Sequence, residues 1–309
     1  MPPKIIRIEP QGFCFGVLRA LRMMQDLTHI NPPKPWYLIG NLVHNRFVKQ
    51  FLTHNGFIIE EDRNKEAVID RINEGTVVFT AHGIDDKIKE KAQNKGLHII
   101  DTTCPFVGKS FSMIKEYLSH GYDIIYLGKT THPETEAALS ISPQVHLIED
   151  LSDIEKLEIQ NPKIALTNQT TMSKFNMEAV EAAVAEKYPQ TVIMDKVCYA
   201  TKIRQEVMRK VAGEAKESGQ KCLFVIVGDP ISNNTRKLSE TAKRFSGQDV
   251  CLVEHLDDLP FESLVLYDTI YLTSGTSTPN VIVEEIYQYL LSGNFEPKKS
   301  VLSPLDYYR

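Results

Sequence analysis

The segment His98-Ile-Ile-Asp-Thr-Thr-Cys104 leads from a short apolar run through a polar turn to a cysteine that precedes an amphipathic stretch. Two other segments follow the same order: Ile5-Ile-Arg-Ile-Glu-Pro-Gln-Gly-Phe-Cys14 and Val192-Ile-Met-Asp-Lys-Val-Cys198. The three cysteines are 90 and 94 residues apart. This spacing indicates a threefold repeat of strand, turn and helix, although the repeats share few identical residues.

Short β-branched apolar runs alternate with amphipathic segments along the chain. The expected strands are residues 5–8, 36–39, 77–80, 98–100, 124–127, 164–167, 192–194, 223–227, 250–253 and 270–273. The expected helices include residues 106–118, 176–187, 203–217 and 281–291. Such alternation is typical of α/β units with mainly parallel sheets.

Each repeat holds two further strands that end in polar turns. The turns after the second strand are Val43-His44-Asn45, Thr131-His132-Pro133-Glu134 and Ser232-Asn233-Asn234, and those after the third are Ala81-His82-Gly83, Gln169-Thr170-Thr171 and Thr276-Ser277-Thr278. Open α/β sheets bind ligands outside the carboxyl ends of their strands. We therefore predict three pseudo-threefold-related α/β lobes around one central site. Their expected bounds are residues 14–103, 104–197, and 198–291 with the N-terminal strand 1–13, before a C-terminal tail, 292–309.

The composition argues against several classes of function. The chain has 309 residues, of which 42% are hydrophobic and 24% charged, and a formal net charge of -5. An acidic chain without clusters of Lys and Arg is not expected to bind nucleic acid. The first residues lack the apolar core of a secretory signal, and no apolar run approaches the ~20 residues of a membrane span. We expect a cytoplasmic protein without a membrane partner.

The five cysteines form no CxxC pair, so a disulfide framework is not expected. Cys222 and Cys251 lie inside apolar strands and are interpreted as inert core residues. Cys14, Cys104 and Cys198 lie at expected helix starts, where backbone N–H groups favour thiolates. Zinc could take three cysteines and a histidine, but its structural cysteines usually come in close pairs. An iron–sulfur cluster on three cysteines keeps one iron open as a Lewis acid, and we favour this interpretation.

Polar residues in the remaining turns suit an anion. We expect His44, His82 and His132 to form, with Ser232, Asn234 and Ser277, a set of hydrogen-bond donors at strand ends and helix starts. Such positions favour phosphate groups. For any single histidine, a structural role is an equally good interpretation.

Glu134 is the better of two candidates for a general acid. It lies closer than Glu136 to the turn that should face the site, and Glu136 is explained as a favourable acid in a first helical turn. Thr170 and Thr171 present hydroxyls at the equivalent turn of the next strand. Their alternative role is to cap the helix that follows.

An ordered set of motifs resembles the family of 4-hydroxy-3-methylbut-2-enyl diphosphate reductases. The set comprises Gly12-Phe-Cys-Phe-Gly-Val17, Val43-His-Asn-Arg46, Ala81-His-Gly83, Asp101-Thr-Thr-Cys-Pro105, His132-Pro-Glu134, Gln169-Thr-Thr171, Val197-Cys-Tyr-Ala-Thr201 and Thr273-Ser-Gly-Thr-Ser277. It runs in order from residue 12 to about residue 280, nearly the whole chain. No single motif is specific, but the ordered set is.

The resemblance implies reductive removal of the allylic hydroxyl of the diphosphate substrate, the last step of the non-mevalonate isoprenoid pathway. It implies a [4Fe–4S] cluster on Cys14, Cys104 and Cys198 with one open iron, and an external electron donor of the ferredoxin or flavodoxin type. The residues that would bind the diphosphate or orient the substrate are His44, His82, His132, Thr170, Thr171, Ser232, Asn233, Asn234 and Ser277. Glu134, Thr170 and His132 would be catalytic.

Two departures from the family pattern and two rival functions are noted. Asn233 stands where the family usually has a second serine, and Phe15 where alanine is common.

The first rival function is that of a redox-neutral hydro-lyase, which would need no external reductant. A non-catalytic cluster or zinc protein that senses redox state would need neither a phosphate-binding cavity nor Glu134.

Overall fold

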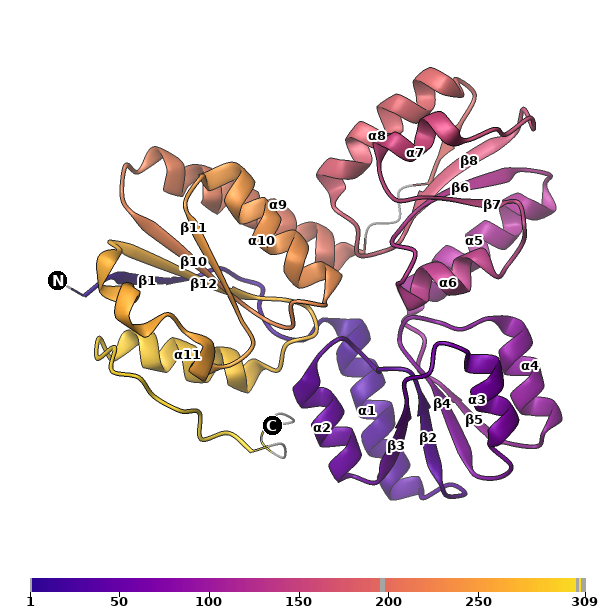
Figure 1. The fold of residues 1–309 in the computed structure, drawn as a ribbon, viewed down its shortest axis with the longest axis horizontal. Helices are drawn as coiled ribbons and strands as arrows, with labels where there is room; N and C mark the ends of the chain where they lie inside the picture. Colours follow the sequence, from indigo (N-terminus) through magenta and orange to yellow (C-terminus); the bar gives the residue numbers. More distant parts are fainter. Residues whose placement is uncertain (1, 195–197, 304–305, 307–309) are drawn as a thin grey trace. The chain divides into compact units, whose positions relative to one another are not determined.

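The computed structural model describes residues 2–194, 198–303 and 306, and it contains three parallel sheets (Figure 1). Sheet A has the order β1-β12-β10-β11, sheet B β3-β2-β4-β5 and sheet C β7-β6-β8-β9. In each sheet the strand before a cysteine, namely β1, β5 or β9, lies at one edge. Beside it lie the third and then the second strand of the preceding repeat, and for β1 these are the strands of the Cys198 repeat. The predicted three-lobed α/β fold with parallel sheets is therefore confirmed.

The strands are short and the helices connect them in chain order. The strands are β1 (Lys4–Arg7), β2 (Trp36–Ile39), β3 (Phe57–Glu60), β4 (Thr76–Phe79), β5 (His98–Asp101), β6 (Asp123–Leu127), β7 (Val145–Ile148), β8 (Ile164–Asn168), β9 (Val192–Ile193), β10 (Cys222–Val227), β11 (Asp249–Val253) and β12 (Thr269–Ser274). The helices are α1 (Phe15–Ile30), α2 (Arg46–His54), α3 (Lys65–Arg71), α4 (Asp86–Asn94), α5 (Pro105–Ser119), α6 (Pro133–Leu139), α7 (Leu151–Lys156), α8 (Lys174–Lys187), α9 (Tyr199–Glu217), α10 (Asn233–Ser246) and α11 (Asn280–Leu291), with two 3₁₀ turns, Leu256–Asp258 and Phe261–Leu266.

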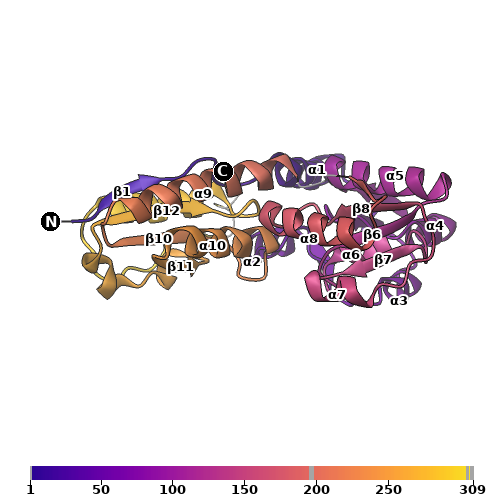
Figure 2. The same cartoon turned by 90° about the horizontal axis from the view of Figure 1, so that it is seen from above.

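Helices cover both faces of sheet A (Figure 1). On one face Phe224 and Ile226 pack against Met208 of α9 and Leu238 of α10, and these two helices lie side by side in both views (Figures 1 and 2). On the other face Val225 and the alternate residues Leu223 and Val227 pack against α11. Successive residues of β10 thus enter opposite cores. This explains why the strand is a continuous apolar run, as expected for a parallel strand buried on both faces.

Sheet C is covered in the same way. Ile125 and Leu127 of β6 contact the core beneath α7 and α8, whereas Ile124 and Tyr126 contact the core beneath α5 and α6 (Figure 1). Parallel pairing in register brings the carboxyl ends of β6 and β8 to the same edge of the sheet. The turns that begin at Gly128 and Gln169 therefore lie next to each other.

The chain divides into two compact units. Unit 1 comprises residues 1–17, 44–55 and 199–309, and unit 2 comprises residues 18–43 and 56–198. Sheet A lies in unit 1, and sheets B and C lie in unit 2. Helix α2 belongs to unit 1, where Phe47 joins the core formed by α11 and β12.

All ten predicted strands are present within one or two residues at each end, and two more, β3 and β7, were not predicted. Both are four-residue strands at the edges of sheets B and C, each paired with one neighbour. Residues 195–197, part of the predicted turn before Cys198, lie outside the described residues. No helix in the described part of the chain is long and apolar enough to cross a membrane.

Candidate active site

The three repeat cysteines occupy equivalent places. Each immediately precedes a helix, α1, α5 or α9, whose first turn contains no acidic residue. Each also donates its backbone N–H to a carbonyl just beyond the neighbouring strand: Cys14 to Thr276, Cys104 to Ala81 and Cys198 to Thr170, at 2.8–3.0 Å. All three side chains are partly exposed thiols. Backbone N–H groups at a helix start suit an anionic ligand or a metal site of thiolates.

The turn before Cys14 is fixed by close contacts within unit 1. Gly12 has φ +69, and its N–H donates to Ser274 Oγ at 2.7 Å. The buried guanidinium of Arg204 donates to the carbonyls of Gly12 and Ser274 at 2.7 and 2.9 Å. A Cβ at position 12 would lie 1.3 Å from Asn280 Oδ1, so glycine is required on both conformational and steric grounds.

The two remaining cysteines match their interpretation as core residues. Cys222 is fully buried in the core under α9 and α10, and Cys251 packs against the core under α11. Burial raises the pKa of the Cys222 thiol, and it raises that of Cys251 to about 11. Both thiols therefore stay protonated at neutral pH and are poor metal ligands.

Neither unit by itself contains all three repeat cysteines, because Cys14 lies in unit 1 and Cys104 and Cys198 lie in unit 2. In the described ranges, His, Cys, Asp and Glu form no group of three or more that could hold a metal ion.

In unit 1 the polar turns after β10 and β12 meet. Ser277 Oγ lies 3.1 Å from the carbonyl of His44, to which it donates, and 3.5 Å from Ser232 Oγ. Ser232 is the N-cap of α10, and the side chain of Asn233 accepts from Arg236 at 3.4 Å. Asn234 is buried, where its Oδ1 accepts from the N–H of Thr276 and its amide donates to Thr201. The structure thus brings His44, Ser232, Asn234 and Ser277 together, with the Asn234 side chain committed to holding the turns.

Burial lowers the pKa of His44, an effect that nearby Arg236 adds to and Asp229 opposes. The neutral form of His44, whose ring carries one N–H, is therefore favoured at pH 7.

In unit 2 the two predicted histidines meet. The His82 and His132 rings lie edge to face with centroids 5.0 Å apart. His132 is the N-cap of α6, and its Nδ1 accepts from the backbone N–H of Glu134 at 3.1 Å. Since Nδ1 is the acceptor, a neutral His132 carries its proton on Nε2.

Glu134 is the most deeply buried carboxyl among the predicted site residues. It is 1% exposed, Oε1 accepts from the Thr170 N–H at 2.7 Å, and Oε2 accepts from the Thr170 hydroxyl at 2.9 Å. Burial raises its pKa to about 7, although the hydrogen bonds from Thr170 oppose the shift. A carboxyl with this pKa is poised to donate and regain a proton at neutral pH.

Glu136 is half-buried and pairs with Lys65 at 3.2 Å. This agrees with its interpretation as a first-turn acid without a chemical role. The helix-cap alternative for Thr170 and Thr171 is not supported, because α8 has Ser173 as its N-cap.

Sequence reasoning missed three buried side chains that hold the site together: Tyr126, Gln169 and Arg204. Gln169 accepts from the Lys129 N–H and donates to the Thr171 hydroxyl at 2.8 Å, which ties the turn after β6 to the turn after β8. A buried arginine or glutamine within a helix or turn has no sequence pattern of its own. Only the position of Gln169 beside Thr170 could have drawn attention to it.

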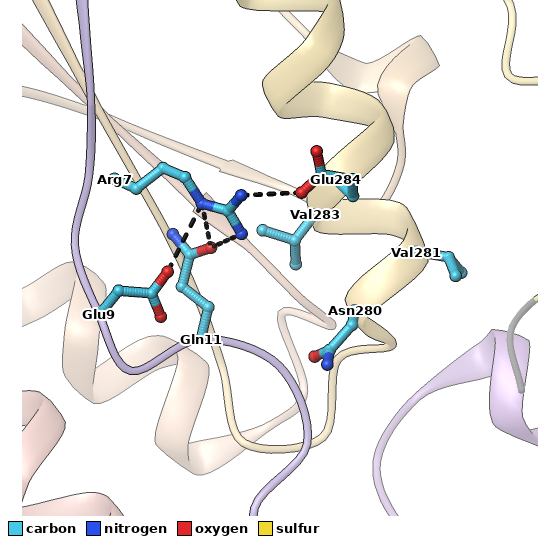
Figure 3. Close-up of a pocket in the computed structure, with 7 residues that line it drawn as sticks. All are labelled: Arg7, Glu9, Gln11, Asn280, Val281, Val283 and Glu284. Atoms are coloured by element: carbon cyan, nitrogen blue, oxygen red, sulfur yellow. Dashed lines mark hydrogen bonds and ion pairs between the residues drawn. The ribbon is translucent and has the colours of Figure 1, made fainter. Parts of the chain in front are cut away.

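A pocket of about 320 Å³ in unit 1 contains none of the predicted site residues (Figure 3). Arg7 is at its centre and is neutralised by Glu284 at 2.8 Å and Glu9 at 3.5 Å, while Gln11 accepts from the guanidinium (Figure 3). With its one cation engaged by two carboxylates, this pocket is unsuited to a phosphate group.

Comparison with known proteins identifies the family of this chain. Residues 5–291 match the model of the LytB protein family. The chain belongs to the LytB family. A curated relative from Geobacillus sp. (strain WCH70), named 4-hydroxy-3-methylbut-2-enyl diphosphate reductase, is 38% identical over 93% of this chain and 90% of its own length. The relative of the same name from Bacillus pumilus (strain SAFR-032) is 37% identical over 95% and 91%.

Solved structures of LytB relatives share the fold. The structure of the E-1-hydroxy-2-methyl-but-2-enyl-4-diphosphate reductase from Plasmodium falciparum superposes with a TM-score of 0.86 at 28% identity, covering 97% of this chain and 92% of that one. A second structure, titled as (E)-4-hydroxy-3-methyl-but-2-enyl diphosphate reductase, the terminal enzyme of the non-mevalonate pathway, gives a TM-score of 0.65 at 26% identity, covering 94% and 100%. The family implies an iron–sulfur cluster, and the recognition made from the motifs is confirmed.

Proposed function

We propose that this chain reduces 4-hydroxy-3-methylbut-2-enyl diphosphate, removing its allylic hydroxyl to give isopentenyl and dimethylallyl diphosphates. The buried Glu134, held at both oxygens by Thr170 and with a pKa of about 7, is the observation that carries the proposal within this chain. The reaction consumes two electrons and two protons and releases water. It therefore needs a reductant and a group that delivers protons at neutral pH.

We propose Cys14, Cys104 and Cys198 as the ligands of a [4Fe–4S] cluster with one open iron. Their equivalent positions at helix starts and partial exposure support the proposal, as does the raised pKa of the two other cysteines. When bound, such a cluster supplies single electrons and a Lewis-acidic iron. The required electron donor is external, of the ferredoxin or flavodoxin type.

Glu134 is proposed to protonate the departing oxygen, and Thr170 to orient the substrate hydroxyl. The Thr170 hydroxyl already donates to Glu134 Oε2, so a substrate hydroxyl bound at Thr170 would lie within reach of the acid. The low exposure of Glu134 keeps bulk water from competing for the proton. His132, whose Nδ1 is engaged at the start of the same helix, would direct its Nε2 side toward substrate as an auxiliary catalytic residue.

The diphosphate is proposed to bind the polar turns of both units. Ser232, Asn233, Asn234, Ser277 and His44 would serve from unit 1, where most of them already lie close together. From unit 2, His82, His132, Thr170 and Thr171 would contribute. Neutral histidine N–H groups, hydroxyls and backbone N–H groups at a helix start suit a phosphate without requiring Arg or Lys.

The lobe boundaries given from the sequence, and the cytoplasmic location of the protein, also remain proposals. The observation behind the lobe boundaries is that sheet B holds the strands within residues 14–103, sheet C those within 104–197, and sheet A those within 198–291 together with β1. The cytoplasmic location is consistent with the reducing conditions that free thiols need.

The proposal is tested by anaerobic purification, metal analysis, a visible spectrum and an assay of allylic diphosphate reduction with a chemical reductant. We expect about four irons per chain and brown colour. Single serine variants of Cys14, Cys104 and Cys198 should lose the iron, whereas Cys222→Ser should retain it. Zinc without iron, turnover without added reductant, or iron loss in Cys222→Ser alone would contradict the proposal.

The role of Glu134 is tested by Glu134→Gln with Glu136→Gln as its control. The first variant should still bind substrate but lose turnover by about 10²-fold or more, the usual contribution of a positioned acid. The second should keep near-normal turnover. If Glu136→Gln alone were inactive, the acid would have been assigned to the wrong carboxyl.

A further inference from the structure

Tyr126 has a buried hydroxyl that the proposed mechanism does not use. Its side chain is fully buried, and its ring packs with Ile114, Ala138 and Met194 in the core beneath α5 and α6. Its hydroxyl makes no hydrogen bond to any described residue. Since a buried donor without an acceptor is costly, such a group in a well-packed core calls for an explanation.

The turn after β6 is built around this tyrosine. A Cβ at Gly128 would lie 2.7 Å from Tyr126 Cε1 and 2.5 Å from Thr135 Oγ1, so glycine alone lets the backbone approach both side chains. The Thr135 hydroxyl in turn lies 3.4 Å from Gln169 Oε1, to which it donates weakly. The ring of Tyr126 thus lies beside α6, and its hydroxyl is close enough to Glu134 and Thr135 for both to affect its pKa.

Glu134 has unused capacity to accept. Thr170 supplies one donor to each carboxyl oxygen, and each oxygen has room for a second. In the described part of the chain, the pKa of this carboxyl is set by burial and by hydrogen bonds. When Glu134 gives up its proton, the new charge lies in a buried site with donors from a single residue, and a third donor would stabilise it.

We propose that Tyr126 is a positioning residue for Glu134, whose hydroxyl donates a hydrogen bond to the carboxylate once Glu134 has released its proton. This inference rests on the proposed role of Glu134 as the acid. The carboxylate gives the buried hydroxyl the acceptor that it lacks, and the hydroxyl limits the cost of the charge. The electrostatics agree in direction: Tyr126 lowers the pKa of Glu134, and the carboxylate raises the pKa of Tyr126 beyond the rise that burial causes.

Other titratable groups near Glu134 are few. His132 precedes it by two residues on α6, and the His82 ring touches that of His132. Thr170, which follows the neighbouring strand β8 and donates both hydrogen bonds to Glu134, does not titrate near neutral pH. Tyr126 is therefore the side chain to change if the ionisation of Glu134 is to be altered without touching the proposed substrate or cluster residues.

The test is the infrared titration of Glu134 in the full chain, purified anaerobically with its cofactor. The carbonyl band of the protonated Glu134 carboxyl is identified as the band that Glu134→Gln lacks, and its loss is followed with pH. Tyr126→Phe removes one atom and keeps the ring in its core. It should move the midpoint upward by about one pH unit, the effect of losing a hydrogen bond to a charged group. Tyr117→Phe, a tyrosine of α5 whose ring contacts Tyr122, should leave the midpoint unchanged.

Turnover provides an independent measurement. In Tyr126→Phe the alkaline limb of kcat, where the acid is lost, should move upward with the infrared midpoint. An unchanged midpoint in folded Tyr126→Phe overturns the proposal for Tyr126. If instead the midpoint moves but Glu134→Gln retains full turnover, the coupling stands and the assignment of Glu134 as the acid fails. The two outcomes are therefore separable.

Discussion

Replacing Glu134 by glutamine should stabilise the folded chain at alkaline pH and leave its stability at acidic pH almost unchanged. Burial raises the pKa of Glu134 from 4.5 to about 7 on folding. Between these values the unfolded chain has lost a proton that the folded chain retains, so the free energy of unfolding falls as the pH rises through this window. At ~1.4 kcal/mol per pH unit, the total loss is about 3 kcal/mol above pH 7.

Glutamine removes this loss because its amide does not ionise. Its carbonyl can still accept from the Thr170 N–H, and the Thr170 hydroxyl can turn to accept from the amide. The variant should therefore gain about 1 kcal/mol or less at pH 5 and about 3 kcal/mol at pH 8, relative to the parent chain.

Urea unfolding at the two pH values, followed by tryptophan fluorescence, measures this difference. The chain has a single tryptophan, Trp36, which is buried in sheet B of the unit that contains Glu134. Glu136→Gln loses its ion pair with Lys65, in which the lysine side chain is 13% and the glutamate side chain 36% exposed, and any change should be similar at both pH values. The reasoning is refuted if the gain in Glu134→Gln is the same at pH 5 and pH 8.

Two further predictions concern the other parts of the site. Gly12→Ala should destabilise the chain by about 1–3 kcal/mol or more and reduce its iron content, because residue 12 has a positive φ and a Cβ there would overlap Asn280. The control is Gly213→Ala, in α9 with open space around it, which should be neutral or stabilising by thermal unfolding. Inorganic diphosphate should raise the melting temperature of the parent chain. His44→Ala should weaken diphosphate binding tenfold or more, whereas His54→Ala, at the exposed end of α2, should not. Equal binding by both variants would remove His44 from the site.

The sequence by itself determined the fold class and most of the proposed site. Strands such as β10 are buried on both faces and are therefore continuous apolar runs, which can be recognised in the sequence without knowing their neighbours in the sheet. The cysteines repeat at strand-to-helix turns, and the structure gives each the same backbone hydrogen bond to the neighbouring strand. The edge strands β3 and β7 were missed; both are four residues long, and a short apolar run by itself does not identify a strand.

The tertiary structure alone decided the properties of the side chains within the site. Glu134 and Glu136 are both acids in the first turn of α6, and only the complete burial of Glu134 against Thr170 separates a carboxyl with a pKa of about 7 from one that pairs with Lys65. Tyr126 reads in the sequence as an ordinary strand residue, and its relation to Glu134 arises because β6 and α6 pack together around Gly128. Burial and charge depend on neighbours distant along the chain, so a local pattern carries no information about them.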